Sequence, residues 1–313
     1  MPKTFPRGRI CWHELMTTDQ KAAIAFYKTT VGWGTQTWPE QPSYIMWTVR
    51  GTTIGGCMVL PEDAKRMNTP PSWVMYVAVP DVDATLRQAV SMGARAYVQP
   101  QDIPTIGRFA VLGDPQGATF ALFTSKTEIP GHDGPAKPGE FSWHELAASE
   151  QGAAWNFYEQ LFGWEKMEAM DMGPTGTYQM FGRGGEMLGG IYNKPREMQA
   201  PPHWLCYALV PSADSTATVV QRLGGKVMNG PMDIPGGGRI AQCMDPQGAA
   251  FALHSNAPDE KAAPKRSAKK ATAKKAAAKK PAKKAAKKAK KKAKKAAKKA
   301  AKKAKKAAKK KKR

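Results

Sequence analysis

The chain has 313 residues, and residues 261–313 hold 29 lysines and arginines but no acidic residue, which leaves residues 1–260 with 20 basic and 25 acidic residues. The basic balance of the chain therefore belongs to one end, and a uniformly basic nucleic-acid-binding globule is excluded. A transmembrane helix is also excluded, because no run of about 18 apolar residues occurs.

The termini and cysteines indicate the compartment. Residues 1–9 lack the apolar stretch of a secretory signal peptide. Cys11, Cys57, Cys206 and Cys243 are scattered without a CxxC spacing, so neither a zinc knuckle nor a disulfide framework is expected. We therefore expect a cytoplasmic protein in which these cysteines are small core residues.

The first predicted module begins near residue 10. Ile10 to Met16 favours a strand, and Thr17 to Asp19 offers capping oxygens to a helix that ends near Gly32. Tyr44 to Val49 and Thr52 to Leu60, separated by Arg50-Gly51, are expected to form a hairpin.

The second module repeats this order. Trp73 to Val79 is a predicted strand, and a helix follows from Asp81 to Gly93. The remaining predicted strands are Ala94 to Gln99, Arg108 to Leu112 and Ala118 to Thr124, the last two joined by an Asp-Pro-Gln-Gly turn.

The whole pattern then recurs 131 residues later. Trp12-His13-Glu14-Leu15 returns as residues 143–146, and Asp114-Pro-Gln-Gly-Ala118 returns as residues 245–249. The predicted organisation is a first domain at 1–127, a linker at 128–138, a second domain at 139–256 and a tail at 257–313. The fold class is α+β, with four βαβββ modules in two tandem domains.

This module order, the helix ending in Phe-Tyr and Gly-Trp, and the closing Asp-Pro-Gln-Gly-Ala strand resemble the vicinal oxygen chelate superfamily of glyoxalases, bleomycin-resistance proteins and dioxygenases. The opening Trp-His-Glu-Leu-Met-Thr-Thr-Asp is similar to its tandem hydroxylase-like branch. The resemblance covers residues 8–255. It implies paired modules whose sheets curl around an open cavity, with the helices outside.

The resemblance also implies a divalent metal held by His, Gln or Glu near the first and last strands of each module. Those positions hold Trp12, Val74 and Ala121 in the first copy, and Trp143, Leu205 and Ala252 in the second. None of these side chains is a metal ligand. We therefore expect no metal and no cofactor in the cavities.

The conspicuous polar pairs are His13-Glu14 and His144-Glu145. Neighbouring residues of a strand point to opposite faces, so Glu14 and Glu145 are expected in the cavities, while the histidines pack toward the helices as core residues. In an enzyme, Glu14 or Glu145 would be the general base and Tyr76 or Tyr207 the acid. The alternative is that these carboxylates form salt bridges with Arg108 or Arg239.

Candidate ligand contacts are aromatic side chains and an arginine at each strand mouth, suited to an aromatic or polyketide-like molecule. The alternatives are that the aromatics are core residues and that each arginine pins a loop by pairing with Asp102 or Asp233. The candidates are Trp12, Tyr44, Trp47, Arg108, Trp143, Tyr178, Phe181 and Arg239.

The tail consists mainly of lysine and alanine, similar to the tails of linker histones. It cannot form a core, so we expect a disordered segment that binds nucleic acid without reading sequence and associates the protein with the nucleoid. A solubilising tail is the alternative. Representative nucleic-acid-binding residues are Lys269, Lys270, Lys287, Lys288, Lys298, Lys299, Lys309 and Lys310.

The favoured function is metal-free binding of a small organic molecule in the domain cavities, with the tail on nucleic acid. Two alternatives stay open. One is a metal-independent lyase, isomerase or hydroxylase-like enzyme, and the other is an architectural protein that compacts DNA. The sequence leaves the oligomeric state undecided.

Overall fold

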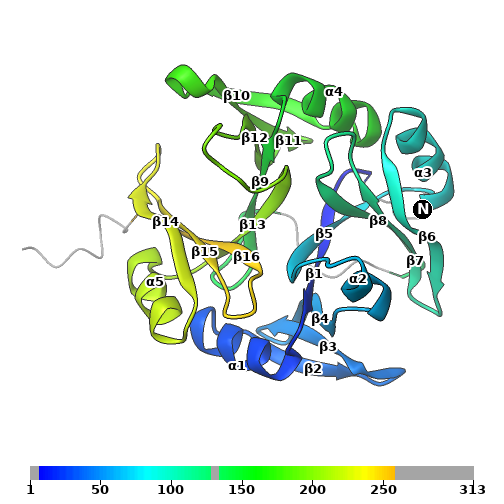
Figure 1. The fold of residues 1–313 in the computed structure, drawn as a ribbon, viewed down its shortest axis with the longest axis horizontal. Coiled ribbons are helices and arrows are strands. Elements are labelled where there is room, and N and C mark those ends of the chain that lie inside the picture. The colour runs from blue at the N-terminus through cyan, green and yellow to red at the C-terminus, as the bar shows by residue number, and fades with distance from the viewer. Residues whose placement is uncertain (1–6, 128–133, 258–313) are drawn as a thin grey trace, which may run out of the picture. The chain divides into compact units, whose positions relative to one another are not determined.

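A computed structural model describes residues 7–127 and 134–257 of the chain (Figure 1). The first repeat forms one eight-stranded sheet in the order β2-β3-β4-β1-β5-β8-β7-β6. Its elements are β1 Ile10–Thr17, α1 Gln20–Thr30, β2 Gly34–Trp38, β3 Gln41–Val49, β4 Thr52–Val59, α2 Glu62–Arg66, β5 Ser72–Ala78, α3 Val82–Ser91, β6 Arg95–Ile103, β7 Gly107–Gly113 and β8 Thr119–Ser125.

The second repeat forms a second eight-stranded sheet in the equivalent order β10-β11-β12-β9-β13-β16-β15-β14. Its elements are β9 Phe141–Ala148, α4 Gln151–Phe162, β10 Glu165–Asp171, the 3-10 helix η1 Gly173–Thr175, β11 Thr177–Arg183, β12 Glu186–Asn193, β13 His203–Leu209, α5 Ala213–Arg222, β14 Lys226–Asp233, β15 Arg239–Met244 and β16 Ala250–Ser255.

The prediction of two tandem domains built from βαβββ modules is thus confirmed. In each sheet the two modules join where their first strands meet: β1 pairs with β5 and β9 with β13, both antiparallel. Each of these central strands also has a parallel neighbour: β4 for β1, β8 for β5, β12 for β9 and β16 for β13. Neither β2 nor the short helix α2 is among the elements predicted from the sequence.

The helices begin where capping side chains were expected. Asp19 accepts a hydrogen bond from the backbone nitrogen of Ala22 at the start of α1, and Asp81 does the same for Ala84 at α3, each at 2.9 Å. The helix α4 ends at Gly163, whose φ of 68° is left-handed and suits glycine.

The two repeats share their cores. The first module of one repeat packs against the second module of the other, so α1 contacts α5 and α3 contacts α4 (Figure 1). One core contains Tyr27, Trp33 and Phe251, and the other contains Tyr158, Trp164 and Phe120. The described residues of the two repeats consequently form one compact unit.

Within the described residues, no helix has the length and apolar character needed to cross a membrane.

Candidate functional site

A hydrogen-bonded carboxylate lies at the centre of the first sheet. We call Trp12, Glu14, Tyr44 and Tyr76 the first carboxylate cluster. The Tyr44 hydroxyl donates to Glu14 Oε2 at 2.8 Å, and the Tyr76 hydroxyl donates to Oε1 at 3.0 Å. Trp12 Nε1 donates to the Tyr44 hydroxyl at 3.0 Å. Three strands of one sheet, β1, β3 and β5, thereby direct polar groups toward one half-buried carboxylate.

The second carboxylate cluster, made of Trp143, Glu145, Tyr178, Tyr207 and Gln242, has the same plan. The Tyr178 and Tyr207 hydroxyls donate to opposite oxygens of Glu145, each at 3.1 Å. Gln242 Nε2 adds a third donor at 3.1 Å to Oε1. The first copy has Val111 in place of Gln242, so the two sites are not chemically equal.

Two glycines let the tyrosines reach the carboxylates. A Cβ at Gly56 would lie 1.9 Å from the Tyr44 hydroxyl oxygen, and one at Gly190 would lie 2.1 Å from Tyr178 Cε1. Both glycines are therefore part of the site, although neither is among the site residues predicted from the sequence. Their signal was present, because Gly55-Gly56 recurs as Gly189-Gly190.

Burial dominates the electrostatics of both clusters. Desolvation raises the pKa of Glu14 and of Glu145, and the tyrosine hydrogen bonds lower each pKa only in part. Burial also raises the pKa of Tyr44 and Tyr76, so both phenols stay protonated and act as donors. Of the four proposed catalytic residues, each glutamate is thus in contact with its tyrosine partner.

The residues at the expected metal-ligand positions lie close together, but their side chains are apolar. Val74 and Ala121 form a buried cluster with Trp12 packed against it. Leu205 and Ala252 do the same with Trp143 in the second sheet. One carboxylate beside an apolar cluster does not supply the several converging ligands that a divalent cation requires. The residues present therefore do not fit the metal that the superfamily implies at this place.

Two of the expected ligand contacts are wrong. Trp47 and Phe181 are fully buried in the cores between the repeats. Trp47 packs with Trp33, and Phe181 stacks on Trp164 at a centroid distance of 4.4 Å. The reason is strand parity, since Trp47 is three residues from Tyr44 on β3 and so projects from the other face.

The two arginines do not reach the carboxylate clusters. Arg108 forms ion pairs with Asp83 at 2.6 Å and Asp102 at 3.4 Å. Arg239 pairs with Asp214 at 2.7 Å and Asp233 at 2.5 Å. The expected alternative of a Glu14 or Glu145 salt bridge with these arginines is therefore wrong. The other predicted alternative, in which each arginine pairs with Asp102 or Asp233 and holds a loop, agrees with the ion pairs of both arginines.

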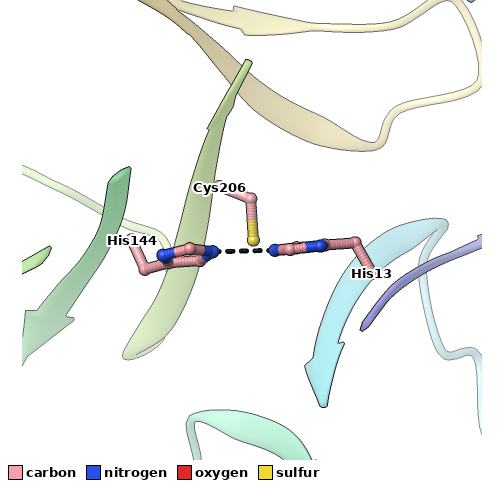
Figure 2. Close-up of side chains that lie close together, drawn as sticks. All are labelled: His13, His144 and Cys206. Carbon is pink, nitrogen blue, oxygen red and sulfur yellow. Dashed lines mark hydrogen bonds between the residues drawn. The ribbon is translucent and has the colours of Figure 1, made fainter. Parts of the chain in front are cut away.

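The histidines lie on the other face of their strands, but they do not pack toward the helices. His13 and His144 instead meet across the junction of the repeats, with their Nε2 atoms 2.7 Å apart (Figure 2). That part of the expectation is wrong because it assumed that each domain covers its own sheet. The tail lysines proposed to bind nucleic acid lie outside the described residues.

Two hollows are present elsewhere. One of about 300 Å³ lies beside Pro115 and Phe157, between the repeats, and the other of about 330 Å³ lies beside Ile234 and His254. Glu14 and Glu145 line neither of them, so these two hollows are separate from the carboxylate clusters.

Comparison with known proteins gives the family. Residues 11–123 match the glyoxalase-like domain, and residues 141–253 match the glyoxalase/bleomycin resistance protein/dioxygenase superfamily. The chain is 34% identical over 265 residues to "Putative glyoxylase CFP32" of Mycobacterium tuberculosis, covering 83% of this chain and 100% of that protein. The chain belongs to the glyoxalase/bleomycin resistance protein/dioxygenase superfamily.

A second curated protein is similar over most of the chain. The anthracycline biosynthesis protein DnrV of Streptomyces peucetius is 29% identical over 263 residues, which cover 80% of this chain and 94% of that protein.

Among solved structures, the Mn(II)-bound glyoxalase of Novosphingobium aromaticivorans has a TM-score of 0.53 at 15% identity, covering 81% of this chain and 83% of that one. The 2,3-dioxygenase LapB of Pseudomonas sp. KL28 has a TM-score of 0.55 at 12% identity, covering 82% and 95%. At such identities the likeness shows the shared fold.

Proposed function

We propose that the protein binds a planar, hydroxylated aromatic molecule at the first carboxylate cluster, without using a metal there. The observation that carries the proposal is the half-buried Glu14 carboxylate, which is held by two tyrosine hydroxyls beside a partly exposed tryptophan. Trp12 offers a flat apolar surface, and the carboxylate offers a fixed acceptor for a ligand hydroxyl.

The acceptor count favours the first cluster over the second. A carboxylate has about four lone-pair positions. Glu14 accepts two hydrogen bonds, from Tyr44 and Tyr76, whereas Glu145 accepts three. Glu145 is also only 8% exposed. Glu14, which is partly exposed, therefore has more free acceptor positions for a ligand hydroxyl.

The relatives support this ligand class. Two of the similar proteins, DnrV and DauV of Streptomyces, are named for anthracycline biosynthesis, and anthracyclines are planar hydroxylated polyketides. The mycobacterial relative is named as a glyoxylase. The proposal is for binding, and a chemical change of the bound molecule would indicate the enzyme alternative built on Glu14 and Tyr76.

The test is calorimetric titration of the full-length, nuclease-treated protein with 1,8-dihydroxyanthraquinone, followed by mass analysis of the recovered compound. We expect one tight site that is weakened by Glu14→Gln and unchanged by the matched Glu145→Gln. Binding that neither substitution alters would contradict the proposal. Conversion of the compound by the wild type and not by Glu14→Gln would replace binding by catalysis.

We also propose that residues 261–313 bind nucleic acid without sequence preference, which would place the protein at the nucleoid of the cytoplasm. The support is that this segment contains 29 basic residues and no acidic residue. Each phosphate that the tail neutralises releases counterions, which favours binding at low salt. The tail has no aromatic side chain to stack on bases and no glutamine or asparagine to read them.

A further inference from the structure

A buried cluster of two imidazoles and a thiol lies at the junction of the repeats, apart from the carboxylate clusters. His13 on β1 and His144 on β9 are each 6% exposed, and Cys206 on β13 is 1% exposed. One ligand atom from each of the three residues lies within 4.8 Å of the others. Figure 2 shows the Cys206 sulfur beside the line that joins the two Nε2 atoms.

A second sulfur occupies the matching place in the first repeat. Cys206 is the cross-strand partner of His144, and Met75 is the cross-strand partner of His13. Met75 is fully buried. The repeat therefore places one sulfur-containing residue opposite each histidine.

The hydrogen bonds of the two imidazoles cannot all be satisfied by neutral rings. His144 Nδ1 lies 3.0 Å from the carbonyl oxygen of Leu188, and the backbone of Ile54 makes the equivalent hydrogen bond with His13. Since a carbonyl oxygen only accepts hydrogen bonds, each neutral ring must donate its single N–H to a carbonyl. Both Nε2 atoms, 2.7 Å apart, then present lone pairs to each other.

A cation between the two nitrogens resolves this conflict. A proton is one candidate, but it would leave an unbalanced positive charge among buried side chains, since both histidines are 6% exposed. The Phe141 ring stacks on His13 at a centroid distance of 3.7 Å, which adds to the apolar surroundings. A metal ion accompanied by a thiolate would carry its own counter-charge.

We propose that His13, His144 and Cys206 form a binding site for a soft monovalent metal ion, Cu(I), with the Met75 thioether as a weaker fourth donor. Two imidazoles, a thiolate and a thioether are donors that suit Cu(I). One Cu(I) and one thiolate sum to zero charge, which a buried site tolerates, whereas Zn²⁺ on the same ligands would leave one positive charge.

Binding requires a small rearrangement. Metal–imidazole bonds of about 2.0–2.1 Å in trigonal geometry separate the two nitrogens by roughly 3.5 Å, so the rings must part by somewhat less than 1 Å. The Cys206 thiol loses its proton to solvent as its sulfur bonds to the metal, and the copper stays Cu(I) throughout. No electron is transferred.

The test uses the full-length protein, loaded anaerobically in two ways: by titration with Cu(I), and by expression in copper-supplemented medium. Retained copper is measured against the competing chelator bicinchoninate. The variant is Cys206→Ala, with Cys206→Ser as a second form that keeps the side-chain size. The matched control is Cys243→Ala, because Cys243 is an equally buried free thiol outside the cluster.

We expect one Cu(I) per wild-type chain, and affinity at least tenfold lower in whichever Cys206 variant keeps the wild-type circular dichroism, since even outer-shell changes cost about 10–100-fold. Cys243→Ala should bind as the wild type does. X-ray absorption of the loaded wild type should show both nitrogen and sulfur neighbours. The proposal is overturned if neither loading route gives retained copper, if copper has no sulfur neighbour, or if Cys243→Ala loses as much as Cys206→Ala.

Discussion

The Tyr27 hydroxyl of the first repeat donates a hydrogen bond to Asp245 Oδ2 of the second, at 3.1 Å, and both side chains are buried. In the equivalent bond, the Tyr158 hydroxyl of the second repeat donates to Asp114 Oδ2 of the first, at 3.0 Å. The two turns that were recognised as repeated Asp-Pro-Gln-Gly segments are thus each fastened to a helix of the other repeat.

These bonds give a stability prediction. Tyr158→Phe removes a donor from Asp114 and the acceptor of Trp204 Nε1, so it should lower the free energy of unfolding by about 1–3 kcal/mol. Tyr27→Phe should cost a similar amount, because Tyr27 also accepts a bond from Trp73. Urea denaturation measures both. The control is Tyr97→Phe, since Tyr97 is 46% exposed. A loss of unfolding free energy no larger than that of Tyr97→Phe would contradict a stabilising role for the two Tyr–Asp hydrogen bonds between the repeats.

The same turns predict a pH dependence. Burial raises the pKa of Asp114, although backbone amides and Tyr158 bond to it. A carboxyl whose pKa is higher in the folded state stabilises the fold below its unfolded pKa of about 3.9, and this contribution is lost as the pH rises through the folded value. The stability of the wild type relative to Asp114→Asn should therefore fall as the pH rises above about 4. Denaturation at several pH values checks this, and a constant or rising difference would contradict it.

Two adjacent glycines should respond differently to alanine. A Cβ at Gly56 would lie 1.9 Å from the Tyr44 hydroxyl oxygen. The Tyr44 side chain can move away from this Cβ, but it then loses its hydrogen bond to Glu14. A Cβ at Gly55 meets the backbone oxygen of His13 at 2.2 Å. We expect Gly56→Ala to weaken ligand binding with little loss of stability.

Gly55→Ala, in contrast, should cost about 1–3 kcal/mol or more of folding free energy, because strand backbones must separate. Thermal melts and ligand titration of the two variants make the comparison. Equal loss of stability in both would show that Tyr44 is not displaced in the way that the geometry requires.

The basic tail gives a prediction about salt. Removing residues 261–313 takes away 29 positive charges and leaves the compact unit of the two repeats intact. Because each neutralised phosphate contributes about −0.9 to the slope of log affinity against log salt, DNA affinity of the full chain should fall steeply with salt. The truncated chain should lose DNA retention at moderate salt and keep its melting temperature. Equal retention by the two forms in a filter-binding assay would contradict the proposed role of the tail.

Much of the fold follows from local signals. The capping residues Asp19 and Asp81, the strand alternation and the repeated Asp-Pro-Gln-Gly turn predict the modules and their order correctly. The strand β2 was not identified because Gly-Thr-Gln-Thr-Trp, at the edge of the sheet, lacks an alternating apolar pattern.

The candidate site was predictable only in part. Strand parity correctly separates Glu14 from His13, and the same rule applied to β3 would have removed Trp47 from the ligand set. The meeting of His13 with His144 could not be predicted, because residues 131 apart in sequence come together through packing of one repeat on the other. A local pattern contains no information about that packing.

Glu14, held by Tyr44 and Tyr76, is the proposed anchor of the ligand site. The claim is tested by measuring the dissociation constant of 1,8-dihydroxyanthraquinone for the wild type, Glu14→Gln and Glu145→Gln side by side. A hydrogen bond to a charged group contributes about 1.5–3 kcal/mol, so Glu14→Gln should weaken binding by about tenfold or more while Glu145→Gln leaves it unchanged. Equal affinity in the wild type and both variants would contradict the claim.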